Sequence, residues 1–416
     1  FEAWAAIGND EWNFQQVLNY YRKVETDSDF GGSDFHNTDG PIICHRFPRD
    51  SWLPAAVAFE QACVDAGFPP CEDANFPGTT GVGALPLNNP NGIRWSTAIG
   101  YLGNARHRLN LTIRGDVFVK RILFDMSGDR PRATGVEVVS GEDSFVLHAD
   151  NVILSAGAVA SPQLLMLSGI GPAQNISRHG IEPILNLPGV GQNLSDHPML
   201  FVTWRTKPEV TLDALGPRIQ VGLRYTAEGS ELDNDMIVYM MAAASDRPER
   251  GGLRSNPIGI QANVCINLAK GKGEVKLNSG DYRDQPYLDY NYLADEEDRR
   301  RFRHAIHMLV GLENHPAMAS LIQERLTPLD SDLATNEALD SWMMKEVTTG
   351  HHISCTNKMG LETDGMAVVD QYGRVRGIDH LRVVDASIMP ECVRANINVT
   401  VMTMAERISD FIKNGL

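Results

Sequence analysis

Two short strands that end in small residues and lead into helices constrain the fold of this 416-residue chain more than any other feature. The first covers residues 151–154, ends in Ser155-Ala156-Gly157, and is followed by a helical pattern over 161–167. The second covers 381–384, ends in Asp385-Ala386-Ser387, and leads through an irregular stretch into a closing helix. Such connections are typical of parallel α/β sheets whose strand ends approach a ligand.

The rest of the chain is mainly extended, with a few helices. Apolar residues recur with the helical period at 11–25, and Pro54 and Gly67 bound a second helix at 54–66. Five prolines and four glycines between 69 and 92 predict a loop. A polar helix is expected at 294–314. Short apolar runs predict strands at 109–113, 117–124, 133–139, 144–147, 200–204, 236–241, 258–268 and 274–277, the first four as an antiparallel meander.

The order of these elements predicts two interleaved domains, because the two α/β units flank the mainly β middle. We expect one domain to comprise residues 95–200 and 365–416. The other would comprise 1–94 and 201–364 and be built on an antiparallel sheet with flanking helices. In the closing helix we expect one apolar stripe of Val401, Ala405, Ile408 and Ile412.

Composition excludes several classes of function. Lys and Arg number 37 against 53 Asp and Glu, a net charge of −16, and nucleic-acid binding would need a basic face instead. The longest apolar run, nine residues at 236–244, is too short for a transmembrane helix. The six cysteines form no C-x-x-C pair, so we expect buried or idle thiols and neither a disulfide framework nor a metal site.

Three stretches carry the residues expected to perform chemistry, and they occur in a family's order and spacing. They are Gly157-Ala-Val-Ala-Ser161-Pro-Gln-Leu-Leu-Met-Leu-Ser168-Gly-Ile-Gly171, Pro188-Gly-Val-Gly191-Gln-Asn193-Leu-Ser-Asp196-His197, and the C-terminal segments His351-His352-Ile-Ser-Cys355-Thr356 and Asn396-Ile-Asn398-Val-Thr400. Together they resemble the glucose–methanol–choline (GMC) oxidoreductases, and the resemblance extends from Phe1 to the last helix. Within it, Gly169 and Gly171 are interpreted as turn glycines.

This resemblance implies a flavoprotein that uses FAD. The domain of 95–200 and 365–416 would then be an incomplete FAD-binding, Rossmann-like domain, and the other domain would bind substrate. The catalytic positions of the family fall on His352 and Asn396, and His351 would contact the cofactor through its backbone. The cofactor-binding positions that the resemblance implies are Val119, Ala156, Gly157, His351, Asp385, Ala386, Ile397 and Asn398.

The residue types suit the oxidation of an alcohol. Hydride leaves an alcohol carbon only as the hydroxyl proton is removed, and an imidazole such as that of His352 has a suitable pKa near neutrality. The amide of Asn396 can bind the same oxygen without carrying charge. A helix that begins near Asn398 would present free N–H groups and its positive dipole end to a reduced flavin or a phosphate.

One expected motif is absent from the 416 residues. A strand, a G-x-G-x-x-G turn and a helix would cradle the pyrophosphate, yet the pairs at Gly81, Gly169 and Gly189 all lack the third glycine. We therefore expect that the N-terminal dinucleotide-binding segment lies outside this chain. The remaining sheet would expose an unpaired edge, and a separate polypeptide carrying the glycine turn would complete it.

Three functions remain open from the sequence. The first is an FAD-dependent alcohol oxidase or dehydrogenase that passes electrons to oxygen or another acceptor. The second is a hydroxynitrile lyase, in which a histidine acts on a cyanohydrin and the flavin stays oxidised. The third is a fragment that binds FAD only with a partner polypeptide. Neither the alcohol nor the compartment can be read from the residues.

Overall fold

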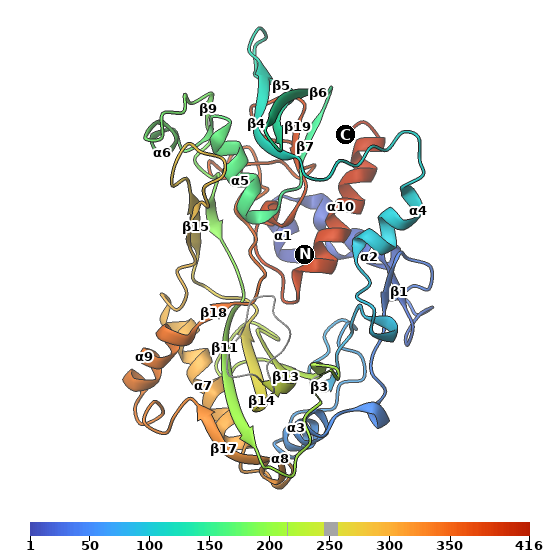
Figure 1. The fold of residues 1–416 in the computed structure, drawn as a ribbon, viewed down its shortest axis with the longest axis vertical. Helices are drawn as coiled ribbons and strands as arrows, with labels where there is room; N and C mark the ends of the chain where they lie inside the picture. The colour runs from blue at the N-terminus through green and yellow to red at the C-terminus, as the bar shows by residue number, and fades with distance from the viewer. Residues whose placement is uncertain (214, 245–256) are drawn as a thin grey trace.

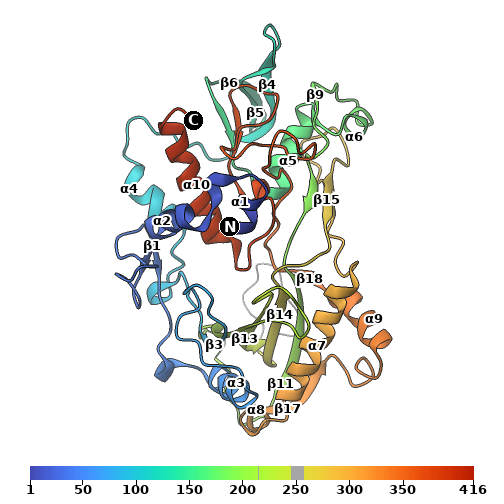
Figure 2. The same ribbon diagram turned by 180° about the vertical axis from the view of Figure 1, so that it is seen from behind.

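The computed structural model describes residues 1–213, 215–244 and 257–416, arranged in two lobes (Figures 1 and 2). Each lobe has its own hydrophobic core. The α10 lobe surrounds the C-terminal helix α10 (Ile397–Lys413), and the sheet lobe surrounds a seven-stranded sheet. The mixture of α/β units and antiparallel sheets predicted from the sequence is confirmed.

The centre of the α10 lobe is the predicted pair of parallel strands. Strand β7 (Val152–Leu154) pairs with β19 (Leu381–Val383) in parallel, with Leu154 opposite Val383. Helix α5 (Gly157–Leu167) follows β7, and the short helix η5 (Ala386–Ile388) follows β19. An antiparallel meander covers this centre: β4 (Phe118–Asp125), β5 (Arg132–Ser140) and β6 (Asp143–His148).

Two N-terminal helices pack in the same lobe. Helix α2 (Phe14–Val24) begins at Asn13, whose side chain accepts a hydrogen bond from the Gln16 N–H at 3.0 Å, and it packs along α10. Helix α1 (Glu2–Ala6) places Trp4 in the core that contains Ile408 and Phe411 of α10. The predicted domain boundaries stay a prediction, and packing groups these first helices with the α10 lobe.

The sheet lobe contains the extended middle of the chain. Its strands run in the order β17-β11-β14-β13-β12-β3, all neighbours antiparallel, and β18 pairs with β11. One face packs against four helices. The strands are β3 (Gly81–Ala84), β11 (Pro198–Thr206), β12 (Ile219–Tyr225), β13 (Met236–Ala244), β14 (Gly259–Ile266), β17 (Ile322–Thr327) and β18 (Thr348–Thr349). The helices are α3 (Pro54–Asp65), α7 (Glu296–Leu312), α8 (Pro316–Leu321) and α9 (Asn336–Glu346).

Shorter elements connect and extend the lobes. Strands β1 (Glu25–Asp27) and β2 (Ile42–Cys44) pair in parallel beside α2. Strands β10 (Gln192–Leu194), β15 (Gly273–Lys276) and β16 (Tyr287–Asp289) form a three-stranded sheet, and β8 (Ile170–Gly171) pairs with β9 (Leu185–Asn186). The remaining helical turns are η1 (Asp10–Trp12), η2 (Arg49–Ser51), η3 (Pro90–Gly92), η4 (Ala98–Leu102), α4 (Gly103–Ala105) and α6 (Ala173–Ser177).

Three local expectations are wrong. Residues 109–113 form no strand, and the apolar side chains of Leu109 and Ile113 are exposed because no strand in the described part of the chain pairs with this segment. The expected loop at 69–92 contains β3, where glycine is required because a Cβ on Gly83 would lie 1.8 Å from the Cys71 carbonyl oxygen. In α10, Ile408 is buried as expected but Ile412 is 39 % exposed. The inward face of that helix instead contains Thr400, Met404, Ile408 and Phe411.

The structure also bears on the membrane and the thiols. Among the described residues, no helix has both the length and the apolar character needed to span a bilayer. All six cysteines are free, and five of them are buried. Two methionines of β13, Met236 and Met240, lie in the core of the sheet lobe.

Candidate active site at the junction of the lobes

The side chains of His352 and Asn396 meet where the two lobes join. His352 lies in the loop after β18, and Asn396 immediately precedes α10, whose first turn points toward the sheet lobe (Figure 1). The Asn396 Nδ2 atom lies 3.2 Å from His352 Nε2. Two residues separated by 44 positions in the sequence are thus in hydrogen-bond contact.

A second histidine, His197, determines which nitrogen of His352 carries the proton. His197 Nε2 lies 2.9 Å from the Val393 carbonyl oxygen, and since a carbonyl only accepts, this nitrogen carries hydrogen. Burial lowers the pKa of His197 to about 3, so the ring is neutral near pH 7 and its Nδ1 is an acceptor. His352 Nδ1, at 2.9 Å, therefore donates to it.

The consequence for His352 is an unprotonated Nε2 that faces Asn396. Burial lowers the pKa of the His352 imidazole, the Asp196 carboxylate opposes this effect, and the ring is neutral at neutral pH. With its hydrogen on Nδ1, the lone pair on Nε2 accepts from the Asn396 amide. Tyr239 on β13 in turn donates its hydroxyl hydrogen to Asn396 Oδ1 at 2.8 Å, which orients that amide.

The Asp196 carboxylate holds the two histidine segments together. It accepts from the backbone N–H of His352 at 2.9 Å and from that of His197 at 2.7 Å. The hydroxyl groups of Tyr292 and Thr349 donate to its other oxygen. A buried carboxylate with four donors is fully satisfied, so Asp196 positions the loops and is not free to act as a base.

A second carboxylate, Asp385, joins the ends of the two parallel strands. Its Oδ2 accepts from the Gly157 N–H at 3.0 Å and from the Ser161 hydroxyl at 2.6 Å. Its Oδ1 accepts from the Ser387 N–H at 2.8 Å. The Ala386 carbonyl then accepts from the Cys355 N–H at 3.1 Å, which links this strand end to the His351–His352 loop.

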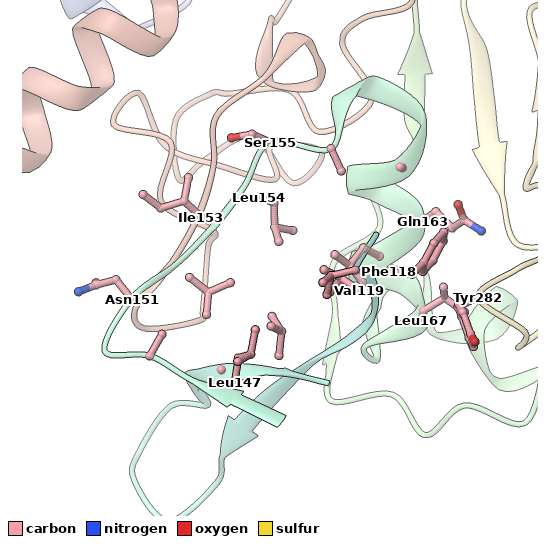
Figure 3. Close-up of a pocket in the computed structure, with 18 residues that line it drawn as sticks. Phe118, Val119, Leu147, Asn151, Ile153, Leu154, Ser155, Gln163, Leu167 and Tyr282 are labelled. Carbon is pink, nitrogen blue, oxygen red and sulfur yellow. The ribbon is translucent and has the colours of Figure 1, made fainter. Parts of the chain in front are cut away.

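An apolar hollow lies beside β7 (Figure 3). It has a volume of about 650 Å³ and is lined by β4, β5, β7 and α5, with Val119 and Ala156 among the lining residues. Strand β7 pairs only with β19, and in the described part of the chain no strand pairs with its outer edge. Ile153 on that edge is 48 % exposed, whereas Leu154 is 5 % exposed.

The predicted cofactor positions thus fall into two connected groups. Val119 and Ala156 line the hollow, and Gly157, Asp385 and Ala386 lie at the adjoining strand ends. His351, Ile397 and Asn398 lie at the junction with His352 and Asn396. The first turn of α10 has no side-chain cap, so its N–H groups are available to an anionic ligand.

Sequence reasoning missed three residues of this site. His197 and Asp196 stand in a quoted motif, and the position of a second histidine there was a signal that we did not use. No sequence pattern around Tyr239 indicates a role at this site, because Tyr239 contacts Asn396 only once β13 has paired in the sheet. The buried thiol of Cys355 has a pKa raised by burial, which opposes a role as a nucleophile.

Outside the site, one cluster has the composition of a cation site. The ligand atoms of Glu25, Asp27 and His36 lie within 4.8 Å of one another. Arg46 already donates to Asp27 at 3.0 Å, and both ring nitrogens of His36 face carboxylates. The cluster therefore already contains a cationic partner, the Arg46 guanidinium, and the expectation that the chain binds no metal stays a prediction.

Comparisons with known proteins agree with this geometry. Two family models described as GMC oxidoreductase match residues 1–199 and 269–405. An oxygen-dependent choline dehydrogenase of Ectopseudomonas mendocina is 36 % identical over 100 % of this chain and 76 % of its own length. One of Serratia proteamaculans is 36 % identical over 99 % and 77 %. Pyridoxine 4-oxidase from Mesorbium loti matches with a TM-score of 0.89 and 28 % identity, over 100 % of this chain and 80 % of that one.

Proposed function

This chain belongs to the GMC oxidoreductase family, and we propose that within it the chain is an FAD-dependent enzyme that oxidises a small alcohol to a carbonyl compound. One observation carries the proposal: the hydrogen bond from His352 to His197 leaves the Nε2 lone pair of His352 free to take a proton beside the amide of Asn396. This is the arrangement that a general base for a hydroxyl group requires.

His352, Asn396 and Tyr239 would have different roles in the oxidation of the alcohol. In the structure, His352 Nε2 accepts a hydrogen bond from Asn396 Nδ2. When the alcohol binds, its hydroxyl group would replace this donor, and Nε2 would take the hydroxyl proton. Asn396 Nδ2 is then free to donate to the substrate oxygen, while Tyr239 keeps the amide oriented from its other end. The carbon loses hydride and the hydroxyl loses a proton, so the alcohol becomes a carbonyl compound.

FAD fits the residues at the strand ends and the first turn of α10. Val119, Ala156, Gly157, Asp385 and Ala386 would hold its dinucleotide end. His351, Ile397 and Asn398 would contact its ring system, where the positive end of a 17-residue helix favours negative charge. When bound, FAD supplies the acceptor of the hydride. The electrons then pass to oxygen or to another acceptor.

We further propose that polypeptide outside these 416 residues supplies the glycine turn for the pyrophosphate. The support is the free outer edge of β7 together with the apolar hollow beside it, because a parallel strand added there would bury Ile153 and the hollow's lining. Native mass spectrometry of the flavin-loaded protein distinguishes a separate partner polypeptide from a longer single chain.

Anaerobic mixing of the flavin-loaded protein with primary alcohols tests the proposed function. Oxidation predicts that the flavin absorbance is bleached in proportion to the carbonyl compound formed. A hydroxynitrile lyase on the same fold would cleave a cyanohydrin and leave the flavin oxidised. Cyanohydrin cleavage without bleaching by any alcohol would therefore replace this proposal with the lyase.

A further inference from the structure

The sheet face that contains Tyr239 is the surface over which a substrate would reach His352. The opposite face packs against α3, α7, α8 and α9, so the alternate residues of each strand point away from those helices. The strand pairing aligns these residues in two cross-strand rows. One row is Met199, Cys265, Ile237, Arg224 and Gly81, and the other is Phe201, Asn263, Tyr239, Gly222 and Gly83.

These two rows contain a single charged side chain, that of Arg224, and no carboxylate. The Arg224 Nη1 atom donates to the Ala74 carbonyl at 2.7 Å, whereas its Nε is buried and has no partner among the described residues. Burial lowers the pKa of Arg224, and the charge of a second arginine, Arg394, also lowers it, whereas Cys71, Tyr239 and the Asp73 carboxylate raise it. Asn263, opposite Tyr239 on the neighbouring strand, also has a buried Oδ1 that no described residue pairs with.

A positive face of this kind discriminates against cations. Two like charges separated by about 8 Å, in a medium with an effective dielectric constant of about 20, repel enough to weaken binding by roughly thirtyfold. A carboxylate on the substrate would instead add attraction between opposite charges and accept charge-assisted hydrogen bonds from the guanidinium.

We propose that the alcohol oxidised here carries an oxygen acceptor, in the strongest case a carboxylate, that binds Arg224, and that it is not a quaternary ammonium alcohol. The chain would then differ in substrate class from the choline dehydrogenases that it resembles at 36 % identity. This inference rests on the proposed function, because it assumes that the alcohol reaches His352 over this face.

A pair of isosteric alcohols tests the charge directly. Choline and 3,3-dimethylbutan-1-ol have nearly the same shape and differ in one positive charge. We expect kcat/KM for choline to be at least about tenfold below that for the uncharged isostere. We also expect 4-hydroxybutanoate to be oxidised more efficiently than pentan-1-ol. A choline efficiency equal to or above that of its isostere overturns the inference.

Charge reversal at Arg224 supplies the second measurement. In R224E the ratio of kcat/KM for choline to that for the isostere should rise at least about tenfold, and in R224Q by less. A ratio within one variant cancels any loss of folded protein. R205Q is the matched control, since Arg205 lies on the same face, six residues along β11 from Met199, and pairs with Glu324 at 2.7 Å. An equal shift in R224E and R205Q overturns the role of Arg224.

The two proposals fail in different ways. If none of these alcohols bleaches the flavin anaerobically, the proposed alcohol oxidation fails and this inference with it. Rapid bleaching with a preference for choline overturns only the inference about Arg224. Calorimetric titration of the protein with the two isosteres gives their affinity ratio without turnover, and tighter binding of choline would count against the inference on its own.

Discussion

The junction of the lobes and the outer edge of β7 differ in how this chain satisfies their polar groups. At the junction, His197, His352 and Asp196 all have partners within the chain. At β7, one edge is paired with β19, and beside the other lie an apolar hollow and the half-exposed Ile153. The proposed base and its supports are thus preorganised by the chain itself, whereas the strand ends proposed to hold the cofactor lie beside an edge that no described strand covers.

The largest expected effect is at the junction. Replacing His352 by Ala removes the base that we propose for the substrate hydroxyl, so the rate of anaerobic flavin reduction should fall by about 10²–10⁴-fold. Stopped-flow absorbance measures this rate. The exposed His107 offers a control, because H107A should reduce its flavin at the wild-type rate. An H352A rate within a few-fold of the wild type would remove His352 from its assigned role.

The next effect compares two neighbours on β7. Leu154 is buried in the α10 lobe, and L154A should lower the free energy of unfolding by about 2–5 kcal/mol. Ile153 points to the opposite face of the strand and is 48 % exposed, and I153A should change this free energy by no more than about 0.5 kcal/mol. Urea unfolding followed by tryptophan fluorescence gives both values. Equal losses would mean that something covers the outer edge, and the contrast between the two regions would disappear.

Acid should destabilise the junction. Burial lowers the pKa of His197 to about 3 in the folded protein, against about 6.5 in an unfolded chain, so below pH 6.5 the unfolded state binds more protons. Stability is therefore complete above that pH and falls toward pH 3, by about 1.4 kcal/mol per unit. From pH 7 to pH 5 the loss from His197 should be about 2 kcal/mol.

Unfolding curves of the wild type and H197L at both pH values measure this difference. The leucine variant should lose less stability on acidification, because the titrating group is gone. The same loss in both proteins would show that His197 is not responsible, and H107L controls for removal of any histidine.

The smallest effect sharpens the description of the junction itself. Y239F removes the hydroxyl that donates to Asn396 and keeps the ring. One hydrogen bond contributes about 0.5–1.5 kcal/mol, so flavin reduction should slow by about tenfold or less. N396A should slow it more, because it removes the donor to the substrate oxygen as well. A larger effect of Y239F than of N396A would contradict the order of contacts inferred here.

Local signals predicted much of this arrangement, and the parts they missed depend on distant pairing. Pro54 and Gly67 bound α3 as expected, since proline and glycine act through their own dihedral angles. Residues 109–113 have a strand pattern but lie exposed, because a strand needs a partner that the described chain does not place there. Likewise, nothing near Tyr239 in the sequence indicates that it meets Asn396, which lies 157 positions away.

The interleaving of the lobes also bears on how the protein can be cut. The chain passes from the α10 lobe to the sheet lobe at α3, returns for β4 to β10 and enters the sheet again at β11. After β14 it visits the α10 lobe once more at β15 and β16, and after β18 it comes back for β19 and α10. A single proteolytic cut in an exposed turn, such as that at 126–130, would therefore not separate the lobes. Each of the two fragments would still contain segments of both lobes. Neither lobe is one continuous stretch of gene, so isolating one requires joining segments that are distant in the sequence.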